Sequence, residues 1–146
     1  MIYGVQIMPL RIIKDERGAV MHMLRADSPV FVSFGEIYFS TVNSCAVKGW
    51  RRHKRMIQNL AVPSGSVQIV LYDDRSRSPT LGEVQDIRLG PESSYALVSV
   101  PPGVWSAFKG LAPGVSLIAN CASIGHEPDE GETRSLTDPP VAFDWS

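Results

Sequence analysis

The stretch VKGWRRHKRMIQNLAVPSG, residues 47–65, changes character halfway and predicts two strands of a β-fold. Its first half holds a dense run of titratable side chains, namely Lys48, Arg51, Arg52, His53, Lys54 and Arg55. Its second half is the apolar run Met56–Val62, which breaks at the turn sequence Pro63-Ser64-Gly65. Because the whole chain has a net charge of only −1, this run is a local excess of positive charge.

The rest of the chain repeats this pattern of short apolar runs separated by turns. Its 12 glycines and 11 prolines fall between runs rich in Val, Ile, Tyr and Phe, and no segment sustains a helical period. This is typical of an all-β sandwich or barrel. Candidate strands are Tyr3–Met8, Ala19–Leu24, Phe31–Thr41, Ala46–Trp50, Met56–Val62, Ser66–Tyr72, Gly82–Leu89, Ala96–Val100, Trp105–Gly110 and Val115–Ser123.

The segment after Gly125 is acidic and rich in proline, so we expect it to be irregular and to cross the surface. We expect one helical turn near Asp129–Glu132. The last residues carry Phe143 and Trp145, which we expect to pack against the barrel.

Length and composition bound the possibilities. At 146 residues and 16.0 kDa we expect a single domain, residues 1–146, that folds without disulfide or metal. The near-neutral charge disfavours a general nucleic-acid binder. Cys45 and Cys121 have no paired spacing and are expected to be free thiols. No signal-peptide pattern and no apolar run of membrane-spanning length is present, so we expect no membrane partner and a cytoplasmic location.

The basic run is the first candidate site. If residues 49–55 form a strand, Arg51, His53 and Arg55 share one face, and Arg52 and Lys54 share the other. Arginine suits a diphosphate because its planar guanidinium makes two charge-assisted hydrogen bonds to one group. The alternative is a solvated strand, or an edge strand protected by charge. His53 is one of three histidines and is a candidate base, or else a hydrogen-bonding residue.

Two weaker candidates lie elsewhere. Arg17 stands in a turn that leads into a strand, although surface Asp–Arg turns are common. Trp105 and Phe108 follow a Pro-Pro-Gly turn, and simple core packing explains them equally well. The chain has no phosphate-binding glycine loop, dinucleotide fingerprint, GxSxG or HExxH motif, so we expect no cofactor.

Several segments together resemble the RmlC-like cupins, which include dTDP-4-dehydrorhamnose 3,5-epimerases and dTDP-4-keto-6-deoxyhexose 3,4-ketoisomerases. The resemblance runs from about Ile12 to Trp145. It is carried by Asp15-Glu16-Arg17-Gly18, Lys48-Gly49-Trp50, Gly65 with Asp74-Arg75, Ser78-Pro79-Thr80-Leu81-Gly82, Pro101-Pro102-Gly103, Asp138-Pro139 and Asp144-Trp145. It implies a cupin jelly-roll barrel (a double-stranded β-helix) with a short irregular C-terminal segment.

The resemblance also implies a homodimer that binds a nucleotide-diphosphate sugar of the dTDP-4-keto-6-deoxyhexose type. Arg17 matches the arginine that contacts the nucleotide or its diphosphate. Lys48 stands where the family usually has arginine. Tyr38 and Tyr72 lie on expected strands where their hydroxyls could face the ligand, Tyr38 as a binding residue and Tyr72 as a catalytic one.

The chain departs from the family pattern at catalytic positions. Arg51 occupies the place of the catalytic histidine, while His53 keeps the second histidine of the ketoisomerases. Gln58 and Ser106 replace the family's lysine and its second conserved histidine, and we expect both to bind substrate. We expect no counterpart of the family's C-terminal extension with its acidic partner, and no residue in 125–128 clearly matches the tyrosine acid.

The same positions, Arg51, His53, Gln58 and Ser106, correspond to the ligands of metal-binding cupins. They make a poor metal site because an arginine cannot be deprotonated to coordinate, so we expect no metal.

Three candidate functions follow from these residues and from the resemblance. The leading one is an isomerase or epimerase of deoxysugar and polysaccharide biosynthesis, including dTDP-rhamnose pathways, with His53 as base and Arg51 or Lys48 stabilising an enolate. The others are a non-catalytic binder of a sugar nucleotide or another anion, and a different enzyme on the same barrel.

Overall fold

The protein is built from strands alone. The computed structural model describes residues 1–146, and all twelve regular elements are β-strands. No helix of a length and hydrophobicity that could cross a membrane is present. The strands are β1 (Gln6–Pro9), β2 (Ile12–Asp15), β3 (Gly18–Met21), β4 (Glu36–Val42), β5 (Val47–His53), β6 (Gln58–Ser64), β7 (Val67–Asp73), β8 (Val84–Leu89), β9 (Ala96–Val100), β10 (Val104–Gly110), β11 (Ser116–Ala122) and β12 (Gly131–Thr133).

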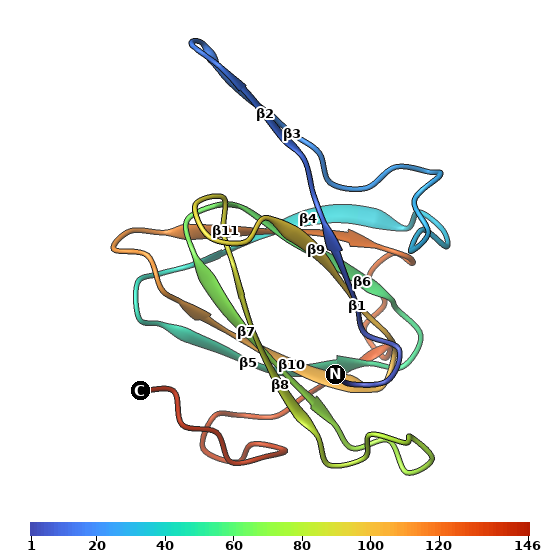
Figure 1. Cartoon of the computed structure of the whole chain (residues 1–146). Coiled ribbons are helices and arrows are strands. Elements are labelled where there is room, and N and C mark those ends of the chain that lie inside the picture. The colour runs from blue at the N-terminus through green and yellow to red at the C-terminus, as the bar shows by residue number, and fades with distance from the viewer.

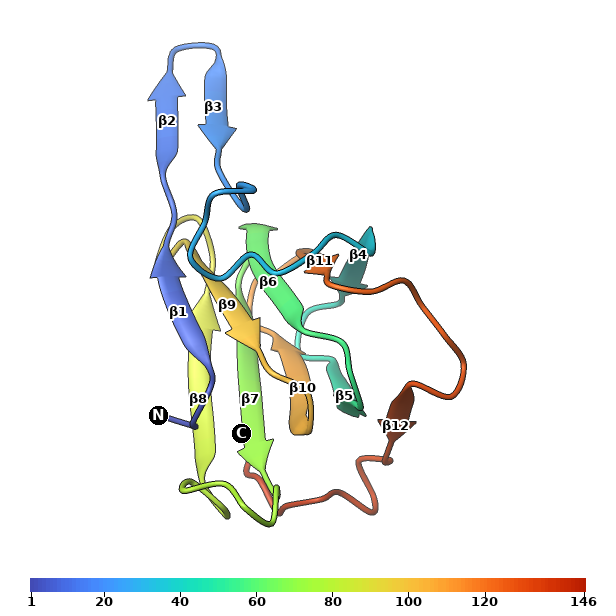
Figure 2. The same ribbon diagram turned by 90° about the vertical axis from the view of Figure 1, so that its right-hand side faces the viewer.

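Ten of the strands form two five-stranded sheets, with strand orders β1-β9-β6-β11-β4 and β12-β5-β10-β7-β8. Figure 1 shows these two sheets facing each other around a common interior. Every pair of neighbouring strands is antiparallel. The expectation of an all-β jelly-roll barrel is confirmed. The remaining pair, β2 and β3, forms a hairpin that projects away from both sheets (Figures 1 and 2).

Alternation along β7 separates two apolar clusters. Ile69 and Leu71 point between the sheets, where 15 buried residues form the main core. Val70 points to the opposite face of the second sheet and packs with the buried rings of Trp50 and Trp105. The period of two along a strand accounts for this division.

The C-terminal segment covers the outer cluster, as expected. Phe143 and Trp145 pack against it, and the ring centroids of Trp145 and Trp50 lie 6.1 Å apart. The segment therefore shields apolar surface that the second sheet would otherwise expose to water.

Most expected strands are present with shifted ends, but four expectations were incomplete or wrong. The expected strand Phe31–Thr41 begins only at Glu36. At Gly35 the chain passes so close to Ile124 that an added Cβ would lie 2.0 Å from its carbonyl carbon. The strands β2 and β12 were not expected. The expected helical turn near Asp129–Glu132 is wrong, since this stretch is a turn that leads into β12.

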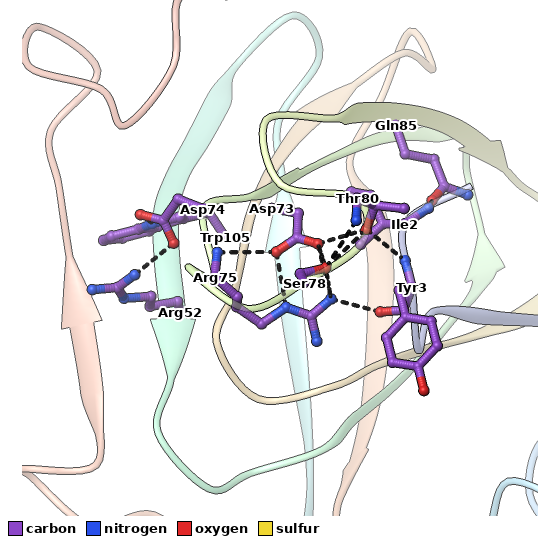
Figure 3. Close-up of polar contacts among 10 residues, drawn as sticks. All are labelled: Ile2, Tyr3, Arg52, Asp73, Asp74, Arg75, Ser78, Thr80, Gln85 and Trp105. Atoms are coloured by element: carbon purple, nitrogen blue, oxygen red, sulfur yellow. Dashed lines mark hydrogen bonds and ion pairs between the residues drawn. The ribbon is translucent and has the colours of Figure 1, made fainter.

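A buried carboxylate organises the loop between β7 and β8. Asp73 is fully buried and accepts hydrogen bonds from the side chains of Arg75, Ser78 and Thr80, at 2.8, 2.5 and 2.7 Å (Figure 3). Burial alone would raise the pKa of Asp73, but these hydrogen bonds hold it well below its usual range. Arg75 also donates to the carbonyl of Tyr3, at 2.6 Å, which ties the N-terminus to this loop.

We predict that Asp73→Ala lowers the free energy of unfolding by about 3 kcal/mol, because it leaves a partly buried guanidinium and two hydroxyls without their acceptor. Chemical denaturation measures this loss. The matched control is Asp27→Ala, which removes an exposed partner of Arg25 and should change the denaturation midpoint little. Equal effects of the two substitutions would contradict this role for Asp73.

Candidate active site

A cavity of about 330 Å³ opens inside the barrel between the two sheets. Side chains of β4, β5, β6, β10 and β11 line it, so it is formed by the parts of the fold with regular structure. Five residues expected at the site are among those that line it, namely Tyr38, Lys48, Arg51, Gln58 and Ser106. The structure thus brings together residues that lie up to 68 positions apart in the chain (Tyr38 to Ser106).

A second cavity of about 370 Å³ adjoins the first. Tyr38 and Arg51 line both cavities, and His53, Met56, Glu36 and His126 complete the second one. His126 lies in the acidic segment after β11, and its sequence gave no reason to expect it here. Through these two shared residues the cavities make up one candidate site with cationic, imidazole and phenol groups.

Alternation along β5 divides the basic run as expected. Arg51 and His53 face the cavities, whereas Arg52 lies on the outer face of the same sheet. The expectation for Arg55 was wrong. Strand β5 ends at His53, so Arg55 lies in the turn that follows, is largely exposed and pairs with Glu127.

Arg52 fastens the C-terminal segment to the outer face of the sheet. Its guanidinium lies 4.7 Å from the centroid of the Trp105 ring and donates to Asp74 at 2.7 Å and to Glu132 at 2.9 Å. Glu132 belongs to β12, which pairs with β5. Figure 3 shows Arg52 beside Asp74 and Trp105. This arrangement fixes the short strand that follows Glu130.

The buried pair of His53 and Glu130 is the chemically distinctive feature of the site. The imidazole is 4% exposed and the carboxylate 2%, and His53 Nδ1 lies 2.6 Å from Glu130 Oε2. The other carboxylate oxygen accepts hydrogen bonds from the backbone amides of Arg55 and Met56, both at 2.8 Å. A carboxylate in this place makes Nδ1 the donor, so in the neutral ring Nε2 carries the lone pair.

His53 Nε2 is buried and has no hydrogen-bond partner. A buried polar atom without a partner is uncommon and is often found where a ligand or a reacting group belongs. Here His53 also lines the second cavity. The arrangement orients Nε2, which in the neutral ring can accept a proton from a molecule bound there.

Arg51 contributes a second group without a partner. Its Nε is buried and makes no hydrogen bond. Its guanidinium packs against Gly131, where an added Cβ would lie 2.9 Å from Nη2. A cationic group in this state can stabilise negative charge on a bound molecule, such as a phosphate or an enolate oxygen.

Two expected site residues lie elsewhere. Tyr72 was expected to be catalytic, but it packs against the outer cluster with Val70, because alternation along β7 turns both residues away from the interior. Arg17 stands at the tip of the β2–β3 hairpin, is 82% exposed and pairs with Asp15 at 2.6 Å. It lines neither cavity of its own chain.

Sequence reasoning missed Glu130, because the only acidic partner it considered was the one on the family's C-terminal extension. Here the carboxylate comes from a different place, the turn that precedes β12. The pairing of Gly131 with His53 in the β12–β5 ladder brings the carboxylate to the imidazole. The available signal was the acidic segment 127–132, but nothing in its pattern identifies a three-residue strand.

The family of the chain follows from direct comparison. A family model described as dTDP-4-dehydrorhamnose 3,5-epimerase, of the dTDP-sugar isomerases, matches residues 1–146. The chain belongs to this family. The expectations of an RmlC-like family and of its isomerase enzyme class are thereby confirmed. The family's solved members share the barrel described above.

Individual relatives are similar to this chain over most of their length. A crystal structure of a dTDP sugar isomerase from Desulfovibrio desulfuricans superimposes with a TM-score of 0.95 and 44% identity, covering 99% of this chain and 92% of that one. A probable low-salt glycan biosynthesis epimerase of Haloferax volcanii is 30% identical over 121 residues, which are 82% of this chain and 77% of the relative.

A more distant solved structure has the same fold and contains a sugar nucleotide. The epimerase RmlC from Legionella pneumophila, solved in complex with dTDP-4-keto-L-rhamnose, superimposes with a TM-score of 0.82 at 22% identity, covering 97% of this chain and 78% of that one. Its likeness shows that the fold is shared.

The ionisation of Glu130 yields a pH prediction. Burial alone would raise its pKa, but the amides of Arg55 and Met56 and the ring of His53 lower it to about 2 from an ordinary value of 4.5. The stability from this shift is therefore present above pH 4.5 and is lost as the pH falls towards 2. We predict that Glu130→Gln lowers stability at neutral pH and flattens its loss between pH 4.5 and 3.

Urea denaturation of both proteins across this pH range measures the difference. Glu127→Gln, in the exposed pair with Arg55, is the matched control and should keep the wild-type slope. A Glu130→Gln protein whose stability falls with acid as steeply as the wild type would contradict the assignment.

Proposed function

We propose that the chain is an isomerase that acts on a nucleotide-diphosphate 4-keto-6-deoxyhexose, in particular a dTDP-linked one. The observation that carries the proposal is the unpartnered Nε2 of His53, which Glu130 orients, in the same cavity lining as Arg51 with its unpartnered Nε. Membership of the dTDP-sugar isomerase family supports the substrate class. The relative solved with dTDP-4-keto-L-rhamnose supports the same class.

The proposed reaction begins with removal of a proton from a carbon next to the C-4 ketone. His53 Nε2 accepts this proton, and the electrons of the broken C–H bond form an enolate. Glu130 stabilises the imidazolium that results, since Nδ1 already donates to its carboxylate. Arg51 stabilises the charge on the enolate oxygen, and Lys48, at the same cavity, assists.

Gln58 and Ser106 are proposed to hold the sugar ring. Both side chains are buried, at 7% and 2% exposure, and both line the cavity inside the barrel. An amide and a hydroxyl offer donors and acceptors that match sugar hydroxyls. Their neutral character leaves the charged steps to His53, Glu130 and Arg51.

A second copy of the chain is the proposed partner. The outer face of β4 presents Ile37 and Phe39, which are 55% and 65% exposed, at the edge of the first sheet. The β2–β3 hairpin stands free of its own barrel (Figure 2) and carries exposed Ile13 and Val20. A homodimer would cover this apolar surface and could place Arg17 of the hairpin near the nucleotide of the partner's site.

The non-catalytic binder is less well supported. Its motive was the loss of several catalytic positions together. Glu130 restores one missing element, a buried acidic partner for a histidine. We further propose that the protein works in the cytoplasm, in the biosynthesis of deoxysugars for a polysaccharide or glycan, for which the glycan biosynthesis epimerase of Haloferax volcanii is the supporting relative.

The central experiment uses dTDP-4-keto-6-deoxyglucose in deuterated water. We predict that NMR shows solvent deuterium entering the sugar at carbon 3 or carbon 5, and that His53→Ala lowers this exchange at least about 100-fold. His22→Ala is the matched control, because His22 lies at neither cavity. Binding of dTDP without any exchange would support the non-catalytic binder and refute the enzyme.

The dimer has its own test. Sedimentation velocity should give a dimer for the wild type, and Phe39→Asp should shift it towards monomer by burying a charge at the interface. Val115→Asp is the control, since Val115 is similarly exposed (58%) but lies in the loop between β10 and β11. A wild-type protein that is still a monomer at about 100 μM would exclude this interface, because even a weak complex would form at that concentration. A dimer that Phe39→Asp leaves unaffected would exclude it as well.

A further inference from the structure

We propose that Tyr38 is the proton donor of the reaction and that Asn120 holds its hydroxyl in the donating orientation. The inference rests on the proposed function, because it assumes an enolate formed by His53. It adds the step that returns a proton to carbon, which the proposed function leaves without a named residue.

Tyr38 is the one tyrosine at the candidate site. The chain has four tyrosines, and Tyr38 alone lines both cavities. Tyr72 packs on the outer face of the second sheet. Tyr95 already donates its hydroxyl proton to the carbonyl of His22, at 2.8 Å. Tyr3 is 64% exposed and lies beside the loop that carries Arg75.

The orientation of the Asn120 amide is fixed by its backbone neighbour. Asn120 Oδ1 accepts a hydrogen bond from the main-chain N–H of Asn59, at 3.1 Å. A main-chain N–H can only donate, so the oxygen of Asn120 must face it and Nδ2 must face the other way. Nδ2 lies 2.8 Å from the hydroxyl of Tyr38. The amide therefore donates to Tyr38.

This contact determines where the tyrosine proton goes. Since the Tyr38 oxygen accepts from Asn120, its own O–H is not used in that bond. No other hydrogen bond of this hydroxyl to the protein is present, so the proton is free for a molecule in the cavity. The same Asn120 N–H stabilises the phenolate that remains after the proton has been given away.

Tyr38 and His53 approach the site from different sheets. Tyr38 lies on β4, at the edge of the first sheet, and His53 lies on β5 in the second sheet. Both line the second cavity, with Arg51. A sugar ring held between the sheets would have the base on one face and the acid on the other, which is the arrangement that inverts a carbon.

The protons balance over the two steps. His53 takes a proton from the carbon next to the ketone, and that C–H bond becomes the double bond of the enolate. The enolate then collapses, its carbon forms a new bond to the proton of Tyr38, and Tyr38 is left as a phenolate. Exchange with water restores the neutral imidazole and the phenol.

The test compares deuterium exchange with product formation in the same reaction, using dTDP-4-keto-6-deoxyglucose in deuterated water. In Tyr38→Phe the base is intact, so deuterium still enters recovered substrate on the face of His53. Inverted product should fall at least about 100-fold, so the ratio of product to exchange falls with it. Tyr3→Phe is the matched control and should keep the wild-type ratio.

A second variant tests the orienting role of Asn120. In Asn120→Asp, one oxygen still accepts from Asn59, but the other replaces the donor and accepts the Tyr38 proton. We expect the ratio of product to exchange to fall as in Tyr38→Phe, with a thermal melt to confirm that the protein is folded. A ratio that stays at the wild-type value in a folded Asn120→Asp protein would overturn the role of Asn120.

The outcomes separate the two claims. An unchanged ratio in Tyr38→Phe, or an equal loss of exchange and product, would overturn the acid role while leaving the isomerase intact. A wild-type protein that gives neither exchange nor product would refute the proposed function, and the inference that rests on it would fall as well.

Discussion

The hydrogen bond between Glu130 and His53 is the contact on which the candidate site depends. A carboxylate buried at this depth is unfavourable unless its lone pairs are used, and here two backbone amides and an imidazole use them. The same contacts hold the chain after β11 against the end of β5. One set of hydrogen bonds thus closes this part of the fold and sets the tautomer of the histidine.

Contacts on the outer face of β5 stabilise the attachment of β12 to this strand. Arg52 and Arg51 are neighbours in sequence but lie on opposite faces of the strand. Arg52 binds Glu132 and Asp74 and lies over Trp105, where it anchors β12. Arg51 is left inside with an unpartnered Nε. The local excess of positive charge is therefore divided between a structural role on the outer face and the candidate site inside the barrel.

The sequence predicted the β architecture well, because alternation and turn residues are local signals. It also predicted that Arg51 and His53 share a face, and that Phe143 and Trp145 pack on the barrel. It failed for Tyr72, because the face of β7 that meets the interior depends on register. It failed for Glu130, because His53 and Glu130 lie 77 positions apart in the chain. The β12–β5 ladder that brings them together leaves no local pattern in the sequence. Arg17 lies on a hairpin that stands free of its own barrel, so nothing within one chain brings it to the candidate site.

The central claim is that Glu130 leaves His53 with a protonated Nδ1 and a free Nε2. Nitrogen-15 NMR of histidine-labelled protein tests it most directly, with His22→Gln and His126→Gln used to assign the signals. The account predicts that His53 in its neutral form is protonated at Nδ1, and that Glu130→Gln moves the proton to Nε2, since the amide oxygen stays with the two backbone N–H groups and its NH₂ faces the ring. A wild-type His53 protonated at Nε2 would contradict the account.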